Sequence, residues 1–147
     1  MSEIIGQVVG GNSLSLQIRV KSSEIIELED LLAVDDKDHT FLLYVDDIAY
    51  RSQHPQNIIE LTAGLKVEGK VNEEDVGLSF IEPELRNYRI IAARILATIT
   101  RNISRTAKKI PPFLSNVRRV RKDDLGFLTK PQNPVYIGKV RSGSKVL

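Results

Sequence analysis

The chain has 147 residues, of which 19 are acidic, 21 are basic, 41% are hydrophobic and none is cysteine. This length and composition are typical of one globular domain, and the lack of cysteine excludes disulfides, thiolate nucleophiles and cysteine metal sites. No apolar run approaches the ~20 residues that a membrane span needs, and the start shows no signal-peptide pattern, so we expect a cytoplasmic protein.

The chain opens with a predicted β-hairpin. Residues 4–9 are short and β-branched, and the Gly and Asn residues within 10–13 suit a turn. Residues 14–20 then alternate apolar and polar side chains at a period of two. This alternation predicts a half-buried strand, and its inward positions are Leu14, Leu16, Ile18 and Val20.

Two further strands are predicted in the first fifty residues, at about 28–34 and 40–50. The acidic turn 35–38 lies between them, and it lacks the Gly and Glu positions of a calcium-binding loop. Four strands with short connections favour an all-β sandwich or a small barrel.

The middle of the chain differs in character. Pro55 suits the start of a short helix over 55–65 with one apolar face. Gly64 and Gly69 weaken or end this helix. The acidic stretch that follows predicts an exposed excursion, so about 51–88 forms an insertion.

The longest apolar stretch, 89–100, has alanines that permit a helix, but its density of β-branched residues favours a strand. A last strand is predicted at 135–140. The fold prediction is therefore mainly β: a small closed barrel of about six strands in one domain, 1–147, with a short helical or irregular insertion. The strands are expected near 4–9, 14–20, 28–34, 40–50, 89–100 and 135–140.

The sequence shows no pattern that indicates a catalytic site. The two histidines, His39 and His54, lie far apart in predicted loops, and no nucleophile–base or metal-ligand cluster is evident. The segment from Gly138 to Lys145 has two glycines five positions apart, but its Ser and Lys stand in the reverse order of a phosphate-binding loop. We therefore expect no catalytic, cofactor or metal site in this chain.

Charge is divided unevenly along the sequence. Residues 1–85 hold 17 acidic and 6 basic side chains, whereas residues 86–147 hold 2 and 15. The densest basic run contains Arg118, Arg119, Arg121 and Lys122, and with Arg101, Arg105, Lys108 and Lys109 it has the charge to track a phosphate backbone. A solvated or subunit-interface basic face is the other interpretation. The acidic counterparts we expect at an interface are Glu73, Glu74 and Asp75.

Three segments together resemble the HerA family of archaeal DNA translocases. The start, Ile5-Gly6-Gln7-Val8-Val9-Gly10, is similar to the family's opening strand. The segment Pro111-Pro112-Phe113-Leu114-Ser115-Asn116-Val117-Arg118 is similar to its Pro-Pro turn and following Val-containing stretch. The segment from Val135 to Gly143 resembles the strand and turn that lead into the ATPase domain. Residues 51–85 match no motif of the family.

The resemblance implies that this region is the HAS barrel, a small N-terminal β-barrel for assembly and partner docking. It implies a hexameric ring that acts with a NurA-type nuclease on double-stranded DNA in end resection and double-strand break repair. It also implies that the parent protein is an ATP-dependent helicase or translocase that uses ATP and magnesium, and that residues 111–147 lead toward an ATPase domain absent from this chain. The alternative is a stand-alone OB-like or translation-type barrel that binds nucleic acid directly.

Overall fold

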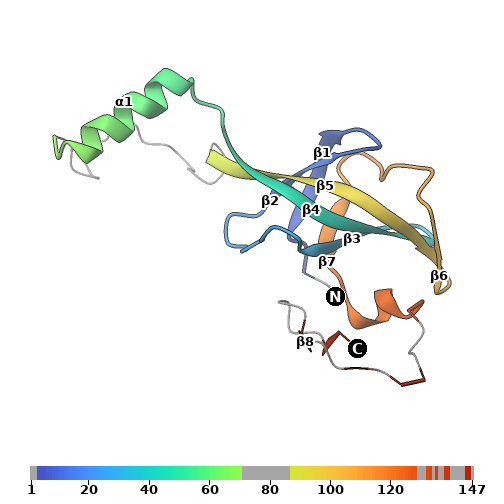
Figure 1. The fold of residues 1–147 in the computed structure, drawn as a ribbon. Helices are drawn as coiled ribbons and strands as arrows, with labels where there is room; N and C mark the ends of the chain where they lie inside the picture. The colour runs from blue at the N-terminus through green and yellow to red at the C-terminus, as the bar shows by residue number, and fades with distance from the viewer. Residues whose placement is uncertain are drawn as a thin grey trace.

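The computed structural model describes residues 3–70, 87–128, 132–133, 135, 138–139 and 145–146. A twisted β-structure forms its centre, and one helix projects from it (Figure 1). The elements in chain order are β1 (Gly6–Gly11), β2 (Leu16–Val20), β3 (Leu31–Asp36), β4 (His39–Ser52), α1 (Gln56–Val67), β5 (Asn87–Thr100), β6 (Ile103–Arg105), β7 (Asn116–Arg119), the 3-10 helix η1 (Lys122–Leu125), β8 (Gly138–Lys139) and β9 (Lys145–Val146).

Six strands close into a barrel. Their order around it is β1, β7, β3, β4, β5 and β2, and β2 pairs again with β1. Every pairing among the described strands is antiparallel, and β6 is an extra strand whose one partner among them is β5. Closure gives each of the six barrel strands a paired neighbour on both sides. The predicted fold, a mainly β closed barrel of about six strands, is confirmed.

Five of the six predicted strands belong to the barrel, but the sixth, predicted at 135–140, does not: its described part is a strand outside the barrel. The described part of that segment, Gly138–Lys139, pairs with Lys145–Val146 in a separate two-stranded sheet. The sixth barrel strand is β7, which the sequence did not indicate. Its four residues include a single apolar side chain, Val117, so period-two alternation has too few positions in which to show itself.

The barrel interior is filled by aliphatic side chains and one Phe. Leu16, Ile18 and Val20 of β2 are buried there as predicted. Leu14 is the exception, with 82% of its surface exposed. The turn between β1 and β2 runs on to Ser15, because the Asn12 side chain accepts hydrogen bonds from the backbone N–H groups of both Leu14 and Ser15. The strand therefore starts at Leu16, two residues later than the alternation indicated.

A second buried layer lies outside the barrel. Ala33 and Leu42 are 0% and 5% exposed, but neither belongs to the core cluster inside the barrel. In each strand, the residues directly before and after them do belong to it. Since successive strand residues point to opposite faces, Ala33 and Leu42 lie on the outer face. Arg118 pairs with Ala33 in the β3–β7 register and shares this face. The segment that carries η1 lies against it, because Arg118 is hydrogen-bonded to Asp124 of η1.

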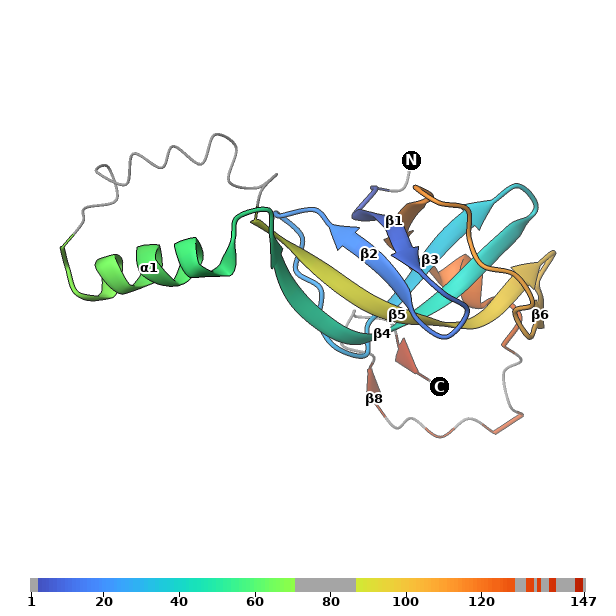
Figure 2. The same ribbon diagram turned by 90° about the horizontal axis from the view of Figure 1, so that it is seen from above.

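The helix forms an arm away from the barrel. The pairing of β4 with β5 continues to Ser52 and Asn87, and α1 follows at the far end of this ribbon (Figures 1 and 2). The helix predicted at 55–65 is confirmed, and it extends to Val67 before Gly69 adopts a left-handed backbone with φ of 65°. None of its residues is buried. Within the described chain, no helix has the length and apolarity to cross a membrane.

Candidate functional site

Arg118, the first residue of the predicted contact set, is 6% exposed. Its Nε and Nη2 donate to Asp35 at 2.7 Å and 2.8 Å, and its Nη1 and Nη2 donate to Asp124 at 2.7 Å and 2.9 Å. A fifth bond, from Nη1 to the Arg119 carbonyl, is 3.1 Å long. A guanidinium has five N–H donors, so every donor of Arg118 is used within the chain. Arg118 therefore connects β3, β7 and η1.

The ion pairs shift the acid–base properties of all three groups. The hydrogen bonds from Arg118 are the main cause of a lowered pKa at Asp35. At Asp124 burial works to raise the pKa, but the hydrogen bonds from the Arg118 side chain and the Arg121 backbone N–H outweigh it, and the pKa is lowered. The hydrogen bond to Asp124, followed by that to Asp35, raises the pKa of Arg118. All three groups are thus held in their charged forms.

Arg119 points the other way and is more accessible. Its side chain is 45% exposed, and its Nη2 donates to the Ile25 carbonyl at 2.6 Å. It also forms ion pairs with Glu24 and Asp30, at 3.4 Å and 3.8 Å. These contacts join β7 to the loop before β3.

The remaining predicted residues are distributed differently. Arg121 and Lys122 are exposed, and neither forms an ion pair with a carboxylate in the described part of the chain. Glu73, Glu74 and Asp75 lie outside the described residues. The basic run thus consists of the buried Arg118, of Arg119, which pairs with carboxylates of the loop before β3, and of two exposed cations, Arg121 and Lys122.

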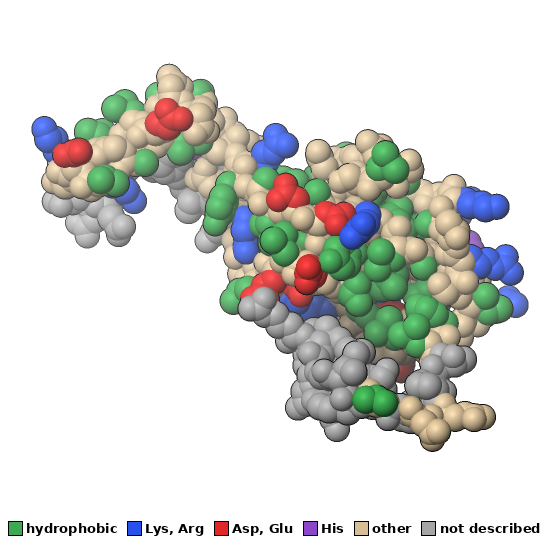
Figure 3. Space-filling view, in the orientation of Figure 1, with side chains coloured by type: hydrophobic (Ala, Val, Ile, Leu, Met, Phe, Trp, Pro, Cys, Tyr) green, Lys and Arg blue, Asp and Glu red, His purple; other side chains and the backbone are tan. Residues whose placement is uncertain are grey.

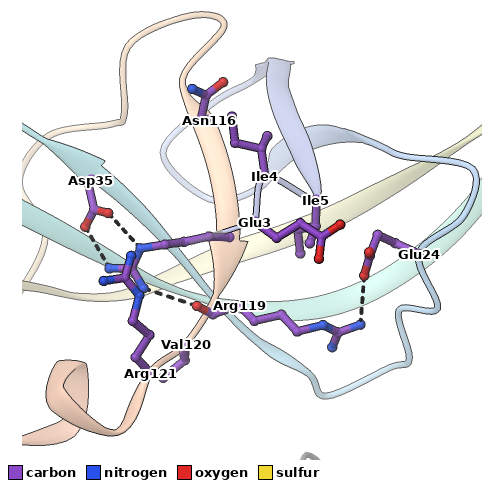
Figure 4. A pocket seen from close by; sticks show the side chains of 10 residues that line it. Glu3, Ile4, Ile5, Glu24, Asp35, Asn116, Arg119, Val120 and Arg121 are labelled. Carbon is purple, nitrogen blue, oxygen red and sulfur yellow. Dashed lines mark hydrogen bonds and ion pairs between the residues drawn. The ribbon is translucent and has the colours of Figure 1, made fainter. Parts of the chain in front are cut away.

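A cleft of about 850 Å³ opens beside β7 (Figure 4). Figure 4 shows Arg119 extending along it toward Glu24, with the N-terminal residues on the same side. The cleft is lined by side chains of both charges and by apolar ones: Glu3, Ile4, Ile5, Glu24, Asp35, Asn116, Arg118, Arg119, Val120 and Arg121.

Exposed apolar side chains lie at the cleft or in the loop that borders it. Ile4, which lines the cleft, is 49% exposed, and Ile25 and Leu28 in the loop are 74% and 56% exposed. Apolar side chains ringed by charged groups are typical of protein–protein contact surfaces. The arrangement can therefore receive a polypeptide segment that supplies an apolar anchor and a charged partner for Arg119 or Arg121.

Sequence reasoning missed the acidic partners in this site. Asp35 was assigned only to a turn, and it lies 83 positions from Arg118. No spacing rule connects residues at such a separation. A local signal did exist for Asp124, whose carboxylate accepts the Arg121 backbone N–H at 2.6 Å, as a residue at the start of a helical turn often does.

The segment that superficially resembled a phosphate loop is a hairpin in its described parts, since Gly138 pairs with Val146 and Lys139 with Lys145. Among the residues that the structure describes, no three His, Asp or Glu side chains gather as a metal site would need.

By its own geometry the chain is a small closed antiparallel β-barrel with a cleft of mixed charge beside β7. A scan against protein-family models finds no match. A search of the curated proteins finds no similar sequence.

Proposed function

We propose that the chain is the assembly and partner-docking barrel of a HerA-like, ring-shaped, ATP-driven DNA translocase in the cytoplasm. It would act with a NurA-type nuclease in DNA end resection and double-strand break repair. One observation supports this most directly. Two of the three segments that carry the family resemblance, although about a hundred residues apart in sequence, are hydrogen-bonded neighbours in a closed barrel.

The two segments meet along their length. The Ile5 N–H donates to the Val117 carbonyl at 2.9 Å, and the Val8 N–H donates to the Ser115 carbonyl at 3.0 Å. The Leu114 N–H returns a bond to the Val8 carbonyl at 2.9 Å. The two segments thus belong to one structural unit, which supports interpreting them together. The third segment, 135–143, lies mostly outside the described residues.

Within this proposal the cleft beside β7 is the docking face for the nuclease. Its exposed apolar residues supply contact area, and Arg119 and Arg121 supply charge for a carboxylate on the partner. The chain itself contributes no catalytic group. ATP and magnesium would be bound by the ATPase part of the parent protein.

The uneven charge of the sequence suits assembly into a ring. Each subunit of a ring shows its neighbour a different surface from the one it receives. Lys122, which does not line the cleft, is our basic candidate for one such surface, and the acidic candidates for the opposing one are Glu73, Glu74 and Asp75, which lie outside the described residues. Exposed ion pairs contribute only ~0–1 kcal/mol each, so these charges would set the register of the ring, and the ATPase core would supply most of its stability.

The docking test measures binding of the chain to the NurA-type nuclease of the same organism by pull-down and titration calorimetry. The variant Arg119→Gln/Arg121→Gln should bind at least tenfold more weakly, a loss of ~1.4 kcal/mol. The control Lys66→Gln/Lys70→Gln removes the same charge from α1 and the residues after it, and should bind normally. Equal binding by all three proteins would exclude this cleft as the docking face.

The family assignment has an independent test in the gene. If the proposal is right, the reading frame continues past Leu147 into a Gly-x-x-x-x-Gly-Lys-Ser/Thr motif, the phosphate loop of the ATPase. A reading frame without such a motif, together with failure to bind the nuclease, would leave the runner-up, a barrel that binds nucleic acid directly. The exposed cations near β6 are the observation in favour of that second function.

A further inference from the structure

Four exposed cations lie within nine residues on and beside β6. They are Arg101 in the turn before the strand, Arg105 at its end, and Lys108 and Lys109 in the segment that follows. No acidic residue occurs anywhere from residue 87 to residue 122. Figure 3 shows Lys and Arg side chains gathered at the β6 end of the molecule. We call these four residues the β6 cations.

The β6 cations differ from Arg94 of β5 and from Arg118 and Arg119 of β7, each of which pairs with a carboxylate. Arg94 pairs with Asp46 and stacks on Tyr44, and Arg118 and Arg119 pair with carboxylates as described above. None of the β6 cations forms an ion pair in the described part of the chain. Four uncompensated charges in so short a segment create a local positive potential that attracts a polyanion.

Neutral hydrogen-bond donors accompany the charge. A hollow of about 590 Å³ lies next to the lysines, and its lining includes the hydroxyl side chains of Ser13 and Thr106 as well as Lys108 and Lys109. β6 also pairs only with β5, so its outer backbone edge is free of any strand in the described chain. Phosphate oxygens accept hydrogen bonds from lysine, arginine, hydroxyl and backbone N–H groups alike.

We propose that the β6 cations and the adjoining hollow form a binding surface for the phosphodiester backbone of double-stranded nucleic acid. The surface follows the three-residue strand β6, the turn before it and the segment after it. Cations spaced along one stretch of chain suit a ligand whose charges repeat along a line. This inference does not rest on the proposed function, since a barrel in a DNA motor and a stand-alone barrel would both use it.

A duplex fits better than a single strand. Single-strand binders stack bases on aromatic side chains, but residues 101–110 contain no Phe, Tyr or Trp, and neither does the lining of the hollow. The surface therefore has charge and hydroxyl groups for a backbone and no platform for exposed bases. Cations on an open strand edge also discourage pairing with the strands of other chains, and this protective role needs no ligand. Measuring DNA binding distinguishes the protective role from nucleic-acid binding.

The test is fluorescence anisotropy of a 30-base-pair DNA duplex titrated with the full chain at several salt concentrations. Four phosphate contacts predict a slope of about −3.6 for log K against log salt, because each contact contributes roughly −0.9. The variant Arg101→Gln/Arg105→Gln/Lys108→Gln/Lys109→Gln should lose most of that slope. At low salt it should bind about tenfold more weakly for each contact removed.

A matched control separates a local surface from net charge. The variant Lys21→Gln/Arg51→Gln/Lys66→Gln/Lys70→Gln removes four positive charges at positions outside residues 101–110. Both variants are first checked for unchanged urea unfolding. The proposal expects the control to keep its DNA affinity within about threefold and its salt slope, whereas equal losses in the two variants would overturn it.

Competition identifies the kind of polyanion. The proposal expects unlabelled duplex to displace the probe at far lower concentration than polyglutamate or single-stranded DNA of equal charge. Polyglutamate that competes as well as duplex would assign the surface to an acidic protein, and tighter binding of the single strand would exclude the duplex. Nuclease binding should be unchanged in the β6 variant, so failure here would leave the docking proposal standing.

Discussion

Arg118 and Asp124 are joined by two hydrogen bonds, of 2.7 Å and 2.9 Å, between the outer face of the barrel and η1. Their side chains are only 7% and 11% exposed. Removing one partner of a buried pair leaves the other charge without compensation in a poorly solvated place. The pair therefore acts as the attachment of η1 to the barrel.

Replacing Arg118 should destabilise the chain strongly. Arg118→Met keeps most of the side-chain volume but leaves Asp124 buried without its cation, so the free energy of unfolding should fall by about 3–5 kcal/mol. Urea unfolding followed by circular dichroism measures the change. Arg121→Met, three residues along and exposed, is the control and should change stability by less than about 0.5 kcal/mol. A loss below 1 kcal/mol in Arg118→Met would contradict the attachment role.

The same cluster predicts a loss of stability in acid. The pKa values of Asp35 and Asp124 are lowered in the folded chain. Their contribution to stability is therefore complete above the unfolded pKa, about 3.9, and is lost as the pH falls through the lower folded values. The urea midpoint of the native chain should decline below about pH 4, and more steeply than that of Asp35→Asn/Asp124→Asn. Parallel pH profiles for the two proteins would show that other carboxylates control acid unfolding.

The fold could be read from the sequence in β2, because buried and more exposed residues alternate along that strand and the apolar pattern therefore reflects burial directly. It could not be read in β7, whose register with β1 and β3 depends on residues about eighty or more positions away. The candidate site divides in the same way. A dense basic run was visible, but burial of Arg118 follows from carboxylates that only the tertiary fold brings to it.

Gly6 is required where β1 pairs with the end of β2, opposite Val20. A Cβ at this position would overlap the backbone carbonyl of Arg19, and backbone cannot move aside as a flexible side chain can. Gly6→Ala should therefore cost about 1–3 kcal/mol of unfolding free energy, the usual effect of forcing extra volume into a packed site. Gly64→Ala in α1 is a matched control with open space around it. It should be neutral or stabilise by about 0.5–1 kcal/mol, because alanine is the better helix former.

The barrel should fold without its arm. None of the residues of α1 is buried, and the β4–β5 ribbon still pairs directly at Ser52 and Asn87. Replacing residues 53–86 with Asn-Gly would join these paired positions through a two-residue turn of the kind that suits antiparallel hairpins. A shorter loop also costs less entropy to close.

The shortened chain should accordingly unfold in one cooperative step, with a free energy within about 1 kcal/mol of the native value or above it, as measured by urea denaturation. Its DNA affinity and salt slope should also be retained, because the β6 cations lie in residues 101–109, beyond the deleted segment. A drop of several kcal/mol would mean that the arm stabilises the barrel through contacts that the described residues do not account for.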